Sequence, residues 1–128
     1  MKYVIIINSS PLASQASLSA YHFANALLER KHQLLSIFFY QQGAYHGSKY
    51  TVLQQDETDV SHLWAALSVA HCCPLHICSA AALRRGIIDA DAAAQYQLPS
   101  SINQHYHTIS LTEFFNLCET SDRMINFA

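Results

Sequence analysis

Charged residues are scarce in this sequence. Only 12% of its 128 residues are Asp, Glu, Lys or Arg, and the formal net charge is −2 with the histidines neutral. This balance excludes the strong electrostatic field with which proteins bind nucleic acid or an anionic membrane. Hydrophobic residues make up 51% of the chain, which is enough for a core and is not the composition of a disordered protein. The length predicts a single domain over residues 1–128, and the apolar composition favours burial of part of its surface against a partner.

Long hydrophobic runs are also missing. The first apolar segment, residues 3–7, is too short for the core of a signal peptide, and no small-residue cleavage pattern follows it closely. No segment approaches the length of a membrane-spanning helix. We therefore expect a soluble, non-exported, cytoplasmic protein. In a reducing cytosol its four cysteines would be free thiols; they are Cys72, Cys73, Cys78 and Cys118.

Two families of motif are absent. The chain has neither a Gly-x-Gly-x-x-Gly fingerprint nor a Walker phosphate loop, so nucleotide binding has little support. Ser9, Ser10 and Ser14 nevertheless lie where they could hold an anion after the first strand. There is no Cys-x-x-Cys motif, and adjacent cysteines such as Cys72 and Cys73 rarely form an unstrained disulfide. A small redox or nucleotide-binding module is therefore disfavoured.

The eight histidines raise the question of a metal site. Five metal-binding side chains are close in sequence: His71, Cys72, Cys73, His76 and Cys78. They lack the paired spacings of structural zinc sites. His76 and Cys78 would share one face of a strand, whereas His71 belongs to the preceding helix. We expect no metal site and no organic cofactor.

The hydrophobic pattern predicts strands and helices that alternate along the chain. Strands are predicted over residues 2–8, 34–40, 74–78, 106–109 and 123–127. Helices are predicted over residues 17–30, 59–70, 79–85, 89–95 and 110–118, and residues 41–50, with two glycines, over a loop. The expected fold is α/β: a three-layer sandwich with a mostly parallel sheet of about five strands and helices on both faces.

Sites in such folds form at the carboxyl ends of the strands. Residues 8–15, residues 41–45 and Cys78 all fall at this edge of the predicted sheet. Tyr40 and Tyr45 flank Gly43 around the second of these segments, where they would line a pocket or pack at the surface. The convergence of the three segments predicts a functional site.

Cys78 carries the clearest chemistry. It lies between the end of an apolar strand and a short helix that Gly86 ends. Backbone N–H groups at a helix start favour negative charge, and the thiolate is the reactive form of cysteine. The alternative is a buried, inert cysteine, which is common in cores. We predict that Cys72, Cys73 and Cys118 have packing roles.

Arg84 and Arg85 lie in the last turn of the same short helix. Cations at that position complement the helix dipole, which favours a structural role. Their alternative role is to dock an acidic partner or to attract an anionic sulfur species.

Four segments resemble a known family: residues 17–28, Phe38-Phe39-Tyr40-Gln41-Gln42-Gly43-Ala44-Tyr45, Ile77-Cys78-Ser79-Ala80-Ala81-Ala82-Leu83-Arg84-Arg85-Gly86 and residues 122–127. The chain resembles the DsrE-like family of sulfur-relay proteins nearly end to end, and a sulfurtransferase subunit of that family most closely. Cys78 stands where the persulfide cysteine of the family stands.

The resemblance implies a sulfurtransferase that carries sulfur on Cys78 as a cysteine persulfide, in a relay toward 2-thiouridine at tRNA wobble positions. It implies a hetero-oligomer with TusB-like and TusC-like subunits, a TusA-like sulfur donor and a TusE-like sulfur acceptor, without direct nucleic acid binding. Two alternatives remain. One is a non-catalytic interaction subunit with an inert Cys78, and the other is a related protein of dissimilatory sulfur metabolism.

Overall fold

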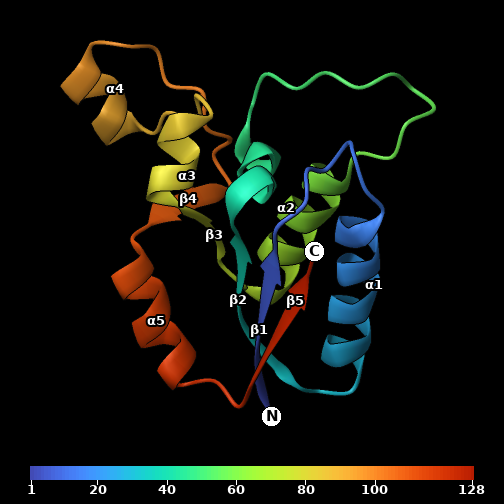
Figure 1. Cartoon of the computed structure of the whole chain (residues 1–128). Helices are drawn as coiled ribbons and strands as arrows, with labels where there is room; N and C mark the ends of the chain where they lie inside the picture. The colour runs from blue at the N-terminus through green and yellow to red at the C-terminus, as the bar shows by residue number, and fades with distance from the viewer.

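The computed structural model describes all 128 residues and is built around a sheet of five parallel strands (Figure 1). The strands are β1 (Lys2–Ile7), β2 (Gln33–Phe39), β3 (Leu75–Cys78), β4 (Tyr106–Ile109) and β5 (Arg123–Phe127). Their order across the sheet is β4-β3-β2-β1-β5, and every neighbouring pair is parallel. The predicted α/β sandwich is confirmed, and its sheet is parallel throughout.

Helices cover both faces of this sheet. They are α1 (Ala16–Glu29), α2 (Val60–His71), α3 (Ser79–Arg84), α4 (Ala90–Tyr96) and α5 (Leu111–Glu119), together with the 3-10 helix η1 (Gln41–Gly47). Figure 1 shows α1 and α2 on one face and α5 on the other. Two adjacent residues of β2 explain this arrangement, because neighbouring side chains of a strand point to opposite faces. Phe39 packs edge-on against Trp64 of α2, and Phe38 stacks on Phe114 of α5 with ring centroids 3.8 Å apart.

The boundaries of the helices follow local signals in the sequence. The Asp59 side chain accepts a hydrogen bond from the His62 backbone N–H at the start of α2. Ser110 and Glu113 form a complete capping box at the start of α5. Gly86, with φ of 73°, follows the last turn of α3. One prediction is wrong: residues 41–50 contain η1 rather than an irregular loop.

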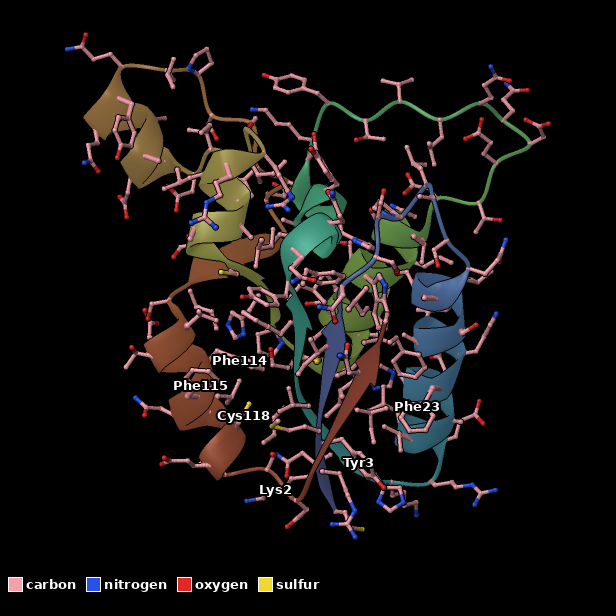
Figure 2. The ribbon with its side chains drawn as sticks, in the orientation of Figure 1. Lys2, Tyr3, Phe23, Phe114, Phe115 and Cys118 are labelled. Carbon is pink, nitrogen blue, oxygen red and sulfur yellow. The ribbon has the colours of Figure 1, made fainter.

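The core is a cluster of 23 buried residues between the sheet and the helices. Its largest fully buried side chains include Trp64, Tyr106 and Phe38. Figure 2 shows Phe114 and Cys118 on α5 at one side of the sheet, and Phe23 on α1 at the other. None of the helices has the length and apolar character needed to span a lipid bilayer.

Candidate active site

Three segments meet beyond the carboxyl ends of the central strands. Asn8 follows β1, Tyr40 and Gln41 follow β2, and Cys78 ends β3. In Figure 1, η1 and α3 lie side by side at this edge of the sheet. They enclose a hollow of about 490 Å³ lined by Tyr40, Gln41, Cys78, Ala80, Ala81, Arg84, Arg85 and Leu111. The sheet edge predicted to carry the site therefore has a hollow beside Cys78.

Cys78 is the last residue of β3 and the N-cap residue of α3. It shares a face of the sheet with Phe38 and His76, because Phe38 pairs with His76 two residues before Cys78. This is the face that α5 covers, which is why Leu111 reaches the same hollow. Only 2% of Cys78 is exposed. The strand end thus leaves Cys78 in the lining of the hollow and almost wholly buried.

Gln41 forms one wall of the hollow, and hydrogen bonds attach this wall to the end of β1. The Asn8 side-chain N–H donates to Gln41 Oε1 at 3.1 Å, and the Gly43 backbone N–H donates to the Asn8 carbonyl at 3.1 Å. Gly43 approaches β1 so closely that a Cβ there would overlap the Ile7 carbonyl oxygen. Gln41 itself has a left-handed backbone with φ of 52°. Close approach to β1 therefore determines the conformation of residues 41–43.

Arg85 links α3 to the same wall. Its Nε donates to Gln42 Oε1 at 3.3 Å, and its Nη1 donates to the Ala81 carbonyl at 3.2 Å. The second bond is a contact between a cation and a carbonyl near the end of α3, which agrees with the structural role predicted for Arg85. Arg84 and Arg85 also both line the hollow beside Cys78. The two guanidinium groups consequently give this cavity a positive potential.

A buried polar network lies behind the wall, and the sequence reasoning missed it. The indole N–H of Trp64 donates to Ser17 Oγ at 3.0 Å, and Ser17 Oγ lies 2.7 Å from His46 Nε2. His46 Nδ1 lies 2.8 Å from the Gly43 carbonyl, which can only accept, so Nδ1 carries the proton. The Ser17 hydroxyl therefore donates to Nε2. No local motif marks this network, because its members lie on α1, η1 and α2.

The other three cysteines differ in their exposure to solvent. Cys73 is buried, and burial raises the pKa of its thiol to about 12. Cys118 packs against the core, and burial raises its pKa as well. The packing role predicted for Cys72 is wrong, because this residue is exposed. Cys72 adopts a left-handed backbone with φ of 52° at the end of α2, which turns it out of the core.

Except for Tyr40, the remaining polar candidates lie outside the lining of the Cys78 hollow. No group of three or more His, Cys, Asp or Glu side chains is placed to hold a metal ion. His76 lies 2.8 Å from the Ser36 hydroxyl, and burial, followed by the nearby His107, lowers its pKa. Ser10 and Ser14 accept hydrogen bonds from the backbone N–H groups two residues further along the chain, and Ser9 Oγ is buried without a hydrogen-bond partner. Of the two tyrosines beside Gly43, Tyr40 lines the hollow and Tyr45 is exposed.

Comparison with known proteins places this arrangement in context. A family model described as the DsrE/DsrF-like family matches residues 1–127. Sulfurtransferase TusD of Salmonella typhi is 40% identical over 128 residues, which span 99% of this chain and 100% of that protein. The Sulfurtransferase TusD homolog of Vibrio parahaemolyticus is 38% identical, with 99% and 98% covered. The crystal structure of the ychN protein from E. coli has a TM-score of 0.79 and covers 99% of both chains. At 19% identity, this last likeness establishes the shared fold.

Proposed function

Since this chain belongs to the DsrE/DsrF-like family, we propose that it is a sulfurtransferase subunit that carries sulfur on Cys78 as a persulfide. The full-length likeness to proteins named Sulfurtransferase TusD supports sulfur transfer as the reaction. The observation that supports Cys78 as the sulfur-carrying cysteine is the hollow at the carboxyl edge of the sheet. Cys78 is the one cysteine that lines it.

The proposed reaction consists of two thiol–persulfide exchanges. The Cys78 thiolate attacks the terminal sulfur of a donor persulfide, a new S–S bond forms on Cys78, and the donor leaves as a thiolate. An acceptor thiolate then attacks the terminal sulfur on Cys78 and regenerates the Cys78 thiolate. Each step breaks one S–S bond and forms another, so no external oxidant or reductant is needed. The rates depend on thiolate fraction, leaving group and access.

The charge of the hollow suits this chemistry. The reacting forms, a thiolate and a persulfide anion, are negative. Arg84 and Arg85 line the cavity beside Cys78, and a nearby guanidinium stabilises an anionic sulfur. Arg85 also donates to Ala81 and Gln42, which limits its motion.

The place of the protein in a relay is part of the proposal. We propose that residues 1–128 act as one domain within a hetero-oligomer of TusB-like and TusC-like subunits. A TusA-like protein would donate the sulfur and a TusE-like protein would accept it, with 2-thiouridine of tRNA wobble positions as the final product. All four cysteines are free thiols, which suits a reducing compartment such as the cytoplasm.

One observation favours the competing function, a non-catalytic interaction subunit. Cys78 is only 2% exposed, as an inert core cysteine would be. Transfer requires that a donor sulfur enter the hollow, whereas an interaction subunit requires no access to Cys78. The two functions therefore differ in whether Cys78 takes up sulfur.

Intact mass after incubation with a persulfide donor tests the proposal. The wild-type protein should gain one sulfur atom, and removal of the donor followed by addition of an acceptor thiol should reverse the gain. Cys78→Ser should gain none. The matched control is Cys72→Ser, since Cys72 is exposed and lies outside the lining of the hollow; this variant should gain sulfur like the wild type. Sulfur uptake by Cys78→Ser equal to that of the wild type would reject the assignment.

A further inference from the structure

We infer that the side-chain amide of Gln41 donates hydrogen bonds to the anionic sulfur of Cys78, both in the thiolate and in the persulfide. This inference rests on the proposed function and adds a second residue to the reaction. Gln41 and Cys78 line the same hollow although 37 positions (78 − 41) separate them in the chain. The role would be electrostatic, since an amide neither gains nor loses a proton in the exchange.

The orientation of the Gln41 amide is determined by Asn8. The Asn8 Nδ2–H donates to Gln41 Oε1 at 3.1 Å, so the oxygen of the Gln41 amide already has its partner. Asn8 is itself held in place, since its backbone N–H donates to the Phe127 carbonyl at 3.1 Å and its carbonyl accepts from Gly43. The two N–H bonds of the Gln41 amide nitrogen lie on the other side of the amide from this contact, and they can donate to a ligand. A ligand beside Gln41 therefore meets a hydrogen-bond donor.

The composition of the hollow supports an anionic ligand. The lining includes two guanidinium groups, a phenol and the Gln41 amide, and none of its eight residues carries a carboxylate. Arg84 and Arg85 supply positive charge from the end of α3, and Gln41 supplies neutral donors from η1. Hydrogen bonds to a charged partner are stronger than those between neutral groups. An anionic sulfur on Cys78 is the negative group that the protein itself brings to this cavity.

The backbone of residues 40–43 holds Gln41 in place for this role. Gln41 has φ of 52°, a left-handed conformation that costs energy for a residue with a Cβ. The Tyr40 backbone N–H donates to the Ile7 carbonyl at 2.9 Å, and Gly43 is pressed against the same carbonyl. These contacts keep the segment in one conformation. Gln41 is exposed to solvent, so its side chain can be changed without opening the core.

Alkylation of the folded protein by iodoacetamide tests the inference, because the rate reports the thiolate. Labelling of Cys78 and Cys72 would be followed by peptide mass spectrometry in one sample, and their ratio would be compared between variants. Cys72 is exposed and serves as an internal control. Gln41→Met removes the donors at similar length, and Gln41→Glu replaces them with acceptors. Gln95→Glu adds the same charge at an exposed side chain outside the hollow lining, where it does not disturb the Arg85–Gln42 contact.

Gln41→Met should lower the Cys78-to-Cys72 labelling ratio about three- to tenfold, because the lost thiolate stabilisation is partly offset by higher nucleophilicity. Gln41→Glu should lower the ratio further, and Gln95→Glu should lower it less than Gln41→Met does. An unchanged ratio in Gln41→Met would overturn the inference, as would equal slowing by Gln95→Glu and Gln41→Glu. A wild-type Cys78 that iodoacetamide cannot reach would also overturn it. The ratio is measured without any persulfide, so failure here is separable from failure of Cys78 to take up sulfur.

Discussion

The hydroxyl of Ser17 donates a hydrogen bond to His46 Nε2 across 2.7 Å, with both side chains buried between α1 and η1. The bond requires a neutral imidazole, since a protonated Nε2 is itself a donor and could not accept from the hydroxyl. Through Nδ1, the same ring holds the Gly43 carbonyl at 2.8 Å. The protonation state of one buried residue therefore affects the segment that forms a wall of the Cys78 hollow.

The first prediction concerns stability in acid. Burial lowers the pKa of His46 from 6.5 to about 4. Between these pH values the unfolded chain binds a proton that the folded chain does not, so the free energy of unfolding falls as pH decreases. The loss attributable to His46 should approach about 3 kcal/mol by pH 4. Urea unfolding between pH 7 and 4 measures it.

His46→Gln and His22→Gln are the variants for comparison. His46→Gln should show a smaller loss of stability between pH 7 and 4 than the wild type, because its side chain cannot take up the proton. His22 is exposed, so His22→Gln should retain the wild-type slope. If all three proteins lost the same stability between pH 7 and 4, the loss could not be assigned to protonation of His46.

A second prediction compares two adjacent phenylalanines of α5. Phe114 is 4% exposed and stacks on Phe38, whereas Phe115 is 59% exposed. Phe114→Ala should lower the free energy of unfolding by about 3–5 kcal/mol, since it leaves a cavity between α5 and the sheet. Phe115→Ala should change it by less than about 0.5 kcal/mol. Chemical denaturation of both variants provides the measurement, and equal losses would show that α5 is not anchored through Phe114.

A third prediction concerns the capping box of α5. Ser110 Oγ accepts a hydrogen bond from the Glu113 backbone N–H at 3.1 Å. Ser110→Ala leaves this N–H without its partner and should cost about 1 kcal/mol of stability. Thr112→Ala, at an exposed position of the same helix, should cost clearly less. Thermal unfolding distinguishes them, and a Ser110→Ala variant as stable as the wild type would exclude the cap as a stabilising contact.

These examples also show which parts of the structure the sequence can predict. The strands β4 and β5 begin and end where their apolar patterns predict, and Ser110 marks the start of α5, because such signals depend on residues a few positions apart. The place of Cys78 between a strand and a helix is local information of the same kind. The order of elements then determines which strand ends meet at one edge of a parallel sheet.

The finer parts of the site depend on contacts distant in sequence. Ser17 bonds His46 across 29 positions and Trp64 across 47, and Asn8 bonds Gln41 across 33. The burial of Cys78 depends on α5, which contributes Leu111 to the hollow. No local pattern encodes such pairs, so the sequence predicted which segments meet near Cys78 but not the depth of Cys78 or the contacts that hold these segments.

The fourth prediction compares two glycines. A Cβ at Gly43 would overlap the Ile7 carbonyl oxygen, whereas a Cβ at Gly86 would meet nothing within 4 Å. Gly86→Ala should cost about 1 kcal/mol, because φ of 73° strains a residue with a Cβ. Gly43→Ala should cost about 2 kcal/mol or more, because the backbone of β1 or η1 must shift. Urea unfolding of both variants tests this ranking, and the reverse order would contradict the close approach at Gly43.

The fifth prediction concerns stability in alkali and depends on Cys73. Burial raises the pKa of the Cys73 thiol from 9.0 to about 12. Between these values the unfolded chain loses a proton that the folded chain keeps, so the free energy of unfolding falls as pH rises. At pH 10.5, ionisation of Cys73 in the unfolded chain should lower the free energy of unfolding by about 2 kcal/mol. Cys73→Ala should therefore lose less stability between pH 8 and 10.5 than the wild type, whatever its stability at pH 8.

Cys72→Ala is the matched control, because Cys72 is adjacent in the chain but exposed. The free energy of unfolding of this variant should fall between pH 8 and 10.5 by as much as that of the wild type. Tyr106 is also buried with a raised pKa, and it weakens the fold in alkali in the same direction. That contribution is common to all three proteins and cancels when their slopes are compared. A Cys73→Ala slope equal to that of Cys72→Ala would mean that the Cys73 thiol ionises as readily in the folded protein as in the unfolded chain.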